Sequence, residues 1–186
     1  MKQLLILFLG ISLLQAQIKE VKIGQQVWMA QNLNVDKFRN GDIIPEAKTA
    51  AEWEKAGENK QAAWCYYNND PSNGITYGKL YNWYAVNDPR GLAPKGWHIP
   101  SDKEWTDLTD YLGGKEQAGA KMKSKEGWIE NGNGTNESGF NGLPGGYRRF
   151  NGIGAGGGSG GQFETEPEEA ALIFAHHLHA ASFLAF

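Results

Sequence analysis

The chain has 186 residues, 25 of them glycine, and a formal net charge of −3 at pH 7. This mild acidity argues against nucleic acid and anionic membranes as partners, because both are bound through basic patches. Seven Trp, seven Tyr and eight Phe favour short strands and long loops around an aromatic core, and the length suits one domain better than two.

Residues Met1–Ala16 have the pattern of a secretion signal. Lys2 precedes an apolar run from Leu4 to Leu14, and the small residue Ala16 comes before a polar segment. The run is too short for a membrane anchor, which needs roughly 20 residues. We therefore expect cleavage and export, with a mature chain that is extracellular or at the cell surface and has no membrane span.

A β-hairpin is predicted over residues 18–29. Apolar and polar side chains alternate on both sides of the turn formers at positions 24 and 25. The alternating apolar residues, which we expect on one face of the hairpin, are Val21, Ile23, Val27 and Met29.

A capping box predicts the first helix. The side chains of Thr49 and Glu52 can each bind the other's backbone N–H, which starts a helix just before an apolar residue, Trp53. We expect this helix to run to Ala56 and to end at Gly57.

A strand and a helix are predicted in the aromatic middle of the chain. Residues 63–67 predict a strand that ends in a stretch of turn formers. Residues 78–86 predict a helix with Leu80, Trp83 and Tyr84 on one apolar face.

A second capping box, formed by Ser101 and Glu104, predicts the clearest helix, with Trp105, Leu108 and Leu112 on one face. A third short helix is expected over Glu116 to Ser124. Loop formers dominate after it, with a brief strand candidate from Tyr147 to Phe150. The side chains to which we assign structural roles are Cys65, Trp83, Trp97 and Trp105.

Cys65 is the single cysteine of the chain. In an exported protein an odd cysteine implies a missing partner, an intermolecular disulfide or a buried thiol. The apolar and aromatic neighbours of Cys65 favour a structural role over reactivity.

Two groups of side chains are candidates for ligand binding. One loop offers oxygen atoms of the kind that calcium prefers, although the same residues also form tight turns. Aromatic side chains in loops offer faces on which sugar rings stack, although such side chains also fill cores. The oxygen group is Asn68, Asn69, Asp70 and Asn73, and the aromatic group is Tyr77, Trp128 and Tyr147. We predict no catalytic residues, and no cofactor apart from this calcium alternative.

Four motifs carry a family resemblance. They are VKIGQQVWMAQNLNV (21–35), AWCYYNNDPSNGITYGKLYNWYAV (63–86), GLAPKGWHIPSDKEWTDL (91–108) and GNGTNESGFNGLPGGYR (132–148). In this order they resemble the Fibrobacter succinogenes major paralogous domain, a family of exported bacterial domains. The resemblance implies an α+β fold related to C-type lectins and formylglycine-generating enzymes, with a small twisted antiparallel sheet, two or three short helices and long loops. It implies no known activity.

The end of the chain departs from this family. Members usually close on a strand of the Gly-Phe-Ser-Val-Arg-Cys type, whereas the last residues here are rich in Ala, Leu, Phe and His. We hypothesise that a frameshift near Gly156 replaced the closing strand, and with it the disulfide partner that the resemblance implies for Cys65. The predicted organisation is a signal at 1–16, a C-terminally incomplete domain at 17–158 and an atypical tail at 159–186. The sheet is then expected to have an unpaired edge.

Export, loop aromatics and the lectin-like resemblance favour a non-catalytic binding or adhesion module. The partner that we expect is a polysaccharide or another surface component. One alternative is an oxidase of the formylglycine-generating type, which needs paired cysteines, whereas this chain has one. The other alternative is a structural protein of the cell envelope.

Overall fold

A computed structural model describes residues 18–129, 131–149, 154–155 and 184–185 of the chain. The predicted signal at 1–16 lies outside these residues, as does the predicted tail apart from positions 184 and 185. The elements in chain order are β1 (Glu20–Ile23), β2 (Gln26–Met29), α1 (Ala50–Glu58), β3 (Trp64–Cys65), the 3-10 turns η1 (Tyr67–Asn69) and η2 (Pro71–Asn73), α2 (Gly74–Tyr77), β4 (Leu80–Tyr81), α3 (Trp83–Val86), β5 (Trp97–His98), α4 (Asp102–Tyr111), α5 (Lys115–Met122), β6 (Tyr147–Arg148), β7 (Gly154–Ala155) and β8 (Leu184–Ala185).

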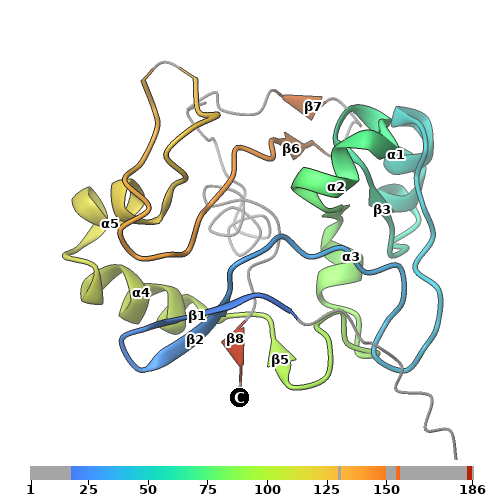
Figure 1. The fold of residues 1–186 in the computed structure, drawn as a ribbon. Helices are drawn as coiled ribbons and strands as arrows, with labels where there is room; N and C mark the ends of the chain where they lie inside the picture. The colour runs from blue at the N-terminus through green and yellow to red at the C-terminus, as the bar shows by residue number, and fades with distance from the viewer. Residues whose placement is uncertain (1–17, 130, 150–153, 156–183, 186) are drawn as a thin grey trace, which may run out of the picture.

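The fold is α+β, as predicted, with short helices around small antiparallel sheets. Figure 1 shows α4 and α5 at one end of the molecule, α1, α2 and α3 at the other, and the β1–β2 hairpin along the base between them. None of the helices in the described ranges is long and apolar enough to cross a membrane.

The predicted hairpin is confirmed, but its four apolar residues do not share one face. The two-residue turn pairs Ile23 with Gln26, so that Val21 lies opposite Trp28. A residue and its cross-strand partner point to the same face, and side chains alternate along a strand. Val21 and Ile23 therefore share a face with Trp28, while Met29 points to the opposite side and is buried there. Both faces of β2 are covered by core.

The strand β8 completes the largest sheet. The strand order is β1-β2-β8-β5, in which Leu184 pairs with Trp28 and with His98, and Ala185 pairs with Trp97. The expectation of an unpaired edge at this position is therefore wrong. Ladder hydrogen bonds join backbone groups, so a segment without the family's closing sequence can still occupy the place between β2 and β5.

Both predicted capping boxes are confirmed. The Thr49 side chain accepts from the backbone N–H of Glu52, whose carboxylate accepts from the Thr49 N–H, and Ser101 and Glu104 make the same reciprocal pair. Helix α1 continues through Gly57 and ends at Glu58, one residue past the predicted stop. Gly57 therefore does not end the helix. The last turn is closed after it by the backbone N–H of Asn59, which donates to carbonyls of that turn.

The predicted helix over 78–86 is replaced by strand β4 and the short helix α3. Tyr81 pairs with Trp64 across β3 and β4, and the Asn82 side chain caps α3. Because the helix begins only at Trp83, this side chain leaves the predicted apolar face and is 36% exposed, which corrects its assignment to the core. Ala85 is the buried residue of α3 instead.

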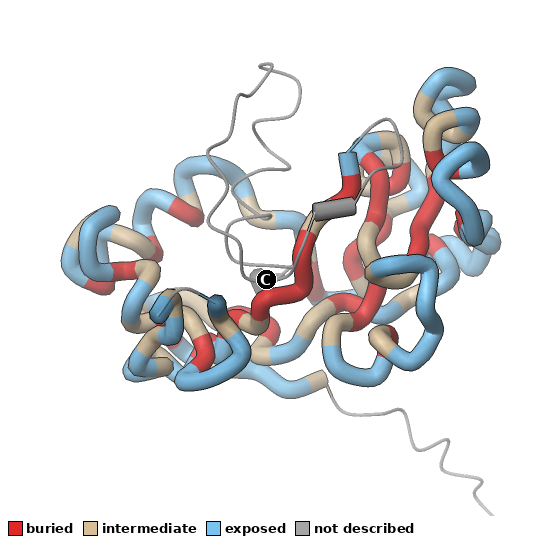
Figure 2. The backbone as a smooth tube through the Cα atoms, turned by 90° about the horizontal axis from the view of Figure 1, so that it is seen from above, coloured by how far each residue is buried: buried red, intermediate tan, exposed pale blue. Residues whose placement is uncertain are grey.

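The core consists of short buried runs spread over many elements, as Figure 2 shows. At the α4–α5 end, Trp28, Trp105 and Phe140 pack their rings together with Leu108 and Met122. A second cluster includes Met29, Ile44, Trp64, Tyr81 and Trp97, and a third joins Trp53 and Cys65. The structural roles predicted for Trp97, Trp105 and Cys65 agree with their burial.

Candidate functional site

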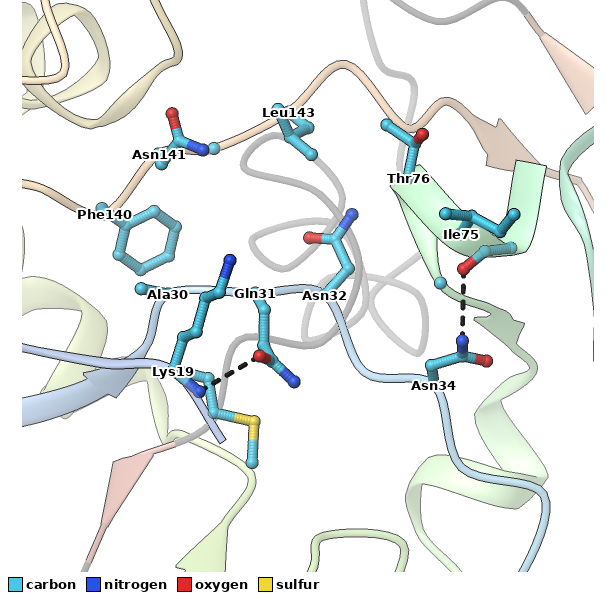
Figure 3. A pocket seen from close by; sticks show the side chains of 14 residues that line it. Lys19, Ala30, Gln31, Asn32, Asn34, Ile75, Thr76, Phe140, Asn141 and Leu143 are labelled. Atoms are coloured by element: carbon cyan, nitrogen blue, oxygen red, sulfur yellow. Dashed lines mark hydrogen bonds between the residues drawn. The ribbon is translucent and has the colours of Figure 1, made fainter. Parts of the chain in front are cut away.

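One cavity lies where three segments of the chain meet, and we call it the amide pocket. It has a volume of about 300 Å³. Its walls come from residues 29–34 after β2, from 74–78 around α2 and from 140–143, with Lys19 at one side. Figure 3 shows Asn32 between the side chains of the other two segments. None of the ligand-binding candidates predicted from the sequence lines this pocket.

Hydrogen bonds to the backbone hold the amide side chains of this pocket in place. Asn34 Nδ2 donates to the Gly74 carbonyl at 3.2 Å, as drawn in Figure 3, and Asn32 Nδ2 donates to the Tyr77 carbonyl at 3.1 Å. Gln31 Oε1 accepts from the Lys19 N–H at 3.1 Å. These three amides each use one polar atom in such a bond, and the fourth, Asn141, accepts from Asn136 Nδ2 through its Oδ1 at 3.2 Å.

The amide pocket presents both hydrogen-bond donors and hydrogen-bond acceptors. Amide groups from Gln31, Asn32, Asn34 and Asn141 are joined by the hydroxyl of Thr76. Among the residues that the structure describes, no Asp or Glu lines the pocket, and Lys19 supplies its one cationic side chain. Phe140 is buried in the core and gives the pocket an apolar floor. Such a surface suits a neutral polyhydroxylated ligand, because each sugar hydroxyl both donates and accepts.

A second cavity, which we call the Arg148 cavity, has a volume of about 280 Å³. It lies between η1 and β6. The residues that line it are Tyr66, Tyr67, Asn68, Asn69, Leu80, Tyr147 and Arg148. The predicted candidates Asn68, Asn69 and Tyr147 thus meet in one place.

Arg148 is a buried cation in the wall of this cavity, because only 9% of the residue is exposed to solvent. Its Nη1 donates to Asn69 Oδ1, and its guanidinium carbon lies 5.4 Å from the centre of the Trp53 ring. Burial raises the pKa of the nearby Cys65 thiol, and the Arg148 guanidinium opposes this effect without cancelling it. Cys65 is therefore a neutral, buried thiol at physiological pH.

The family model of the Fibrobacter succinogenes major domain matches residues 21–170. The chain belongs to this family. The matched range contains every residue of the Arg148 cavity and all of the amide pocket except Lys19. It also extends past position 158, the end that the motifs suggested. No curated protein and no solved structure matches the chain.

The predicted oxygen cluster is divided between several local roles. Asp70 Oδ1 accepts from the Ser72 N–H at 2.9 Å, and these hydrogen bonds hold the pKa of Asp70 below its usual value. Asn73 Nδ2 donates to the Tyr67 carbonyl at 3.0 Å, and Asn69 accepts from Arg148. Asn68 and Asn69 have φ values of 53° and 54°, a left-handed conformation that asparagine tolerates. The geometry is that of consecutive turns. The part of the chain that the structure describes has no group of three or more His, Cys, Asp or Glu side chains placed to hold a metal.

The predicted aromatic group does not form a common platform. Tyr77 packs edge to face on Tyr67, with ring centres 6.5 Å apart. Trp128 is half-buried, and its indole N–H donates to Ser124 Oγ and to the Gly142 carbonyl. Of these three aromatic side chains, only that of Tyr147 belongs to a residue that lines one of the two cavities.

Sequence reasoning missed the residues that matter most in both cavities. Asn32 and Asn34 stand in the motif QNLN after β2, where alternating amides around the buried Leu33 are a recognisable signal. Arg148 had no such signal. Its partner Asn69 is 79 positions away in the chain, and an arginine next to another arginine normally indicates a solvated surface.

Proposed function

We propose that the chain is an exported, non-catalytic module whose amide pocket binds part of a carbohydrate. The observation that supports this most directly is the convergence of four amides and a threonine hydroxyl on one pocket without a carboxylate. Backbone hydrogen bonds fix Asn32 and Asn34 before any ligand arrives, so less side-chain entropy is lost on binding.

Ile75 adds an apolar element to this surface. Its side chain is 92% exposed and belongs to the residues that line the pocket. An exposed large apolar residue beside a set of polar groups is a feature of ligand sites, because the non-polar face of a sugar ring gains contact there while its hydroxyls bind the amides.

The proposal is tested with the full chain on an array of neutral and acidic bacterial and plant saccharides. We expect binding to at least one saccharide, and Asn32→Ala and Thr76→Val are expected to weaken it about threefold to tenfold, the range for one lost hydrogen bond. Asn59→Ala is the matched control, because Asn59 follows α1 and lines neither cavity.

A wild-type chain that binds no saccharide contradicts the proposal, and so does an Asn32→Ala chain that binds as tightly as wild type. Thermal melting of each variant separates a lost contact from a lost fold, since Asn32 also anchors the Tyr77 carbonyl. The Thr76 side chain is exposed, so Thr76→Val is expected to leave the melting temperature unchanged.

Export is the second part of the proposal and is supported by the sequence of residues 1–16. The chain is expressed in a bacterial host, and the N-terminus of the secreted product is read by mass spectrometry. We expect a chain that starts at Gln17. A chain that keeps Met1 and stays in the cell contradicts export without affecting the test of carbohydrate binding.

A further inference from the structure

The buried charge of Arg148 lacks a neutralising partner in the described ranges of the chain. The ion pairs found there join Arg90 to Asp42 and to Asp88, His98 to Glu104, and Lys103 to Asp107. The hydrogen bond to Asn69 and the contact with the Trp53 ring offset only part of the hydration that the guanidinium loses. A buried charge of this kind lowers stability, and such a cost is often found where the charge has a function.

The hydrogen bonds of Arg148 are also incomplete. Nη1 donates to Asn69 and the guanidinium also interacts with the Cys65 thiol, but the buried Nε has no hydrogen-bond partner. The nearby Cys65 does not supply a negative charge, because burial keeps its thiol protonated. The guanidinium therefore has donors and a positive charge left over at the wall of a cavity.

The rest of the cavity adds neutral hydrogen-bonding groups. Tyr66 and Asn68 line it beside Arg148, and none of its lining residues in the described part of the chain carries a carboxylate. Its volume of about 280 Å³ is close to the lower end of the range for small-ligand sites. One cation among hydroxyl and amide groups is the arrangement that recognises an oxyanion carried by a polar molecule.

The two cavities share a wall. Residues 66–69 line the Arg148 cavity and residues 74–78 line the amide pocket. Gly74 packs directly under the Tyr66 ring, where an added Cβ would come within 2.3 Å of a ring carbon. A saccharide held by the amide pocket is therefore next to the segment that carries the second cavity.

We propose that the Arg148 cavity binds the oxyanion of an acidic saccharide, either the carboxylate of a uronic acid or a sulfate ester. This inference rests on the proposed carbohydrate binding and narrows its ligand class. Arg148 supplies the charge, Tyr66 and Asn68 bind neighbouring hydroxyls, and the amide pocket holds an uncharged part of the same ligand.

Calorimetric titration of the full chain tests this inference with three probes. They are a galacturonate trisaccharide, its methyl ester and a sulfated galactose trisaccharide. We expect an acidic probe to bind at least about tenfold more tightly than the ester, which is the effect of losing one charge-assisted hydrogen bond. This comparison uses the wild-type chain only, so it does not depend on whether a variant folds.

Arg148→Gln is expected to remove the preference for the acidic probe, and Arg148→Lys is expected to keep part of it. Arg149→Gln is the matched control, because it removes the same charge from the next residue, which is exposed and does not line the cavity. Tyr66→Phe is expected to weaken the binding of the acidic probe and of its ester by the same factor.

The outcomes separate this inference from the function on which it rests. Equal binding of the methyl ester and of both acidic probes by the wild-type chain overturns the Arg148 site, even when all three bind through Asn32. A preference for the acidic probe that survives in Arg148→Gln also overturns it. A preference for the sulfated probe that depends on Arg148 supports it and identifies the oxyanion as sulfate. Absence of binding to every saccharide overturns the proposed function itself.

Discussion

The two ends of the molecule differ in whether they bury charged side chains. At the α4–α5 end, the buried Ser124 hydroxyl donates to the Glu126 carbonyl and accepts from the Trp128 indole, so it is fully used. At the α1–α3 end, two cations, Lys79 and Arg148, are buried with no ion pair among the described residues. Among the described residues, the second end alone therefore has buried cations without an ion pair, and the oxyanion site that we propose at Arg148 lies there.

Lys79 shows how such a charge is partly stabilised without a carboxylate contact. Its Nζ lies 4.2 Å from the centre of the Trp64 ring and 5.9 Å from that of Tyr66. Burial lowers the pKa of Lys79, while the more distant charges of Asp36 and Glu46 act in the opposite direction. Attraction to the aromatic rings therefore offsets part of the lost hydration.

The largest effect is expected at the α4–α5 end. Trp28 is fully buried and its ring centre is 4.6 Å from that of Trp105. Trp28→Ala leaves a large void there and is expected to lower the free energy of unfolding by about 3–5 kcal/mol, measured by urea denaturation. Ile43→Ala is the control, because Ile43 is exposed and its loss changes stability by less than about 0.5 kcal/mol. A loss below about 1 kcal/mol for Trp28→Ala would show that this cluster is loosely packed.

A smaller but clear loss is expected from the buried amide at the other end. Asn82 Oδ1 accepts from the N–H groups of Ala63 and Ala85, and its Nδ2 donates to the Gln61 carbonyl. Asn82→Ala leaves these groups buried without partners, which is expected to lower stability by about 1–3 kcal/mol. Asn87→Ala, which removes an exposed amide of the following turn, is the control in the same denaturation series. Equal effects for both variants would show that the α1–α3 end does not depend on internal hydrogen bonds.

The acid sensitivity of the α4 end is expected to depend on Glu104. Burial raises the pKa of this carboxyl, but hydrogen bonds from Ser101 and from His98, whose Nε2 is 2.8 Å from Oε1, outweigh burial and leave the pKa below its usual value. A carboxyl with a lowered folded-state pKa stabilises the fold above its unfolded-state pKa, and this stabilisation is lost as the pH falls through the folded-state pKa.

Glu104→Gln is therefore expected to be about 0.3–1 kcal/mol less stable than wild type at pH 7, because glutamine keeps the capping hydrogen bond but loses the negative charge at the helix N-terminus. The difference should shrink as the pH falls below the usual pKa of a glutamate side chain and through the lowered folded-state pKa of Glu104, because the wild-type carboxyl then becomes protonated. Urea denaturation at a series of pH values measures both quantities. A difference that stays constant with pH would show that the ionised carboxylate has no part in the stabilisation.

The smallest effect on stability is expected from removing the charge of a buried cation. Buried cations are also the feature by which the two ends differ most directly. Lys79→Met keeps the length of the side chain and removes the charge. The variant loses the attraction between the ammonium group and the Trp64 ring, but it also no longer has the cost of burying that charge. These two effects oppose each other, so the free energy of unfolding is expected to change by less than about 1 kcal/mol. Lys79→Ala is the comparison, since it also removes the packed methylene groups. A loss above about 3 kcal/mol for Lys79→Met would mean that the charge itself stabilises this end.

Signals contained within a few residues predicted the structure well. The pairs Thr49 with Glu52 and Ser101 with Glu104 determine where α1 and α4 begin, and the structure has both boxes. The turn at Gly24-Gln25 likewise predicted the hairpin. These features depend on hydrogen bonds between neighbours in sequence, which are nearly independent of the rest of the fold.

Features that depend on distant partners could not be predicted in the same way. Residues 80–81 form a strand because Tyr81 meets Trp64, which overrides the helical pattern of the apolar side chains. Arg148 becomes a cavity residue only because β6 brings it to Asn69 and Trp53. Asn68, Asn69 and Tyr147 were candidates from the sequence and line the Arg148 cavity, whereas no candidate lines the amide pocket, because the side chains that meet there depend on this packing.

The burial of β2 on both faces also bears on how the domain opens. Trp28 belongs to the cluster at the α4–α5 end, whereas its neighbour Met29 belongs to the cluster around Trp64 and Tyr81. Any fluctuation that lifts this strand disrupts both clusters together, so the slowest amide protons at the two ends should exchange with solvent through one shared opening. A single four-residue strand thereby makes two differently built halves unfold as one cooperative unit.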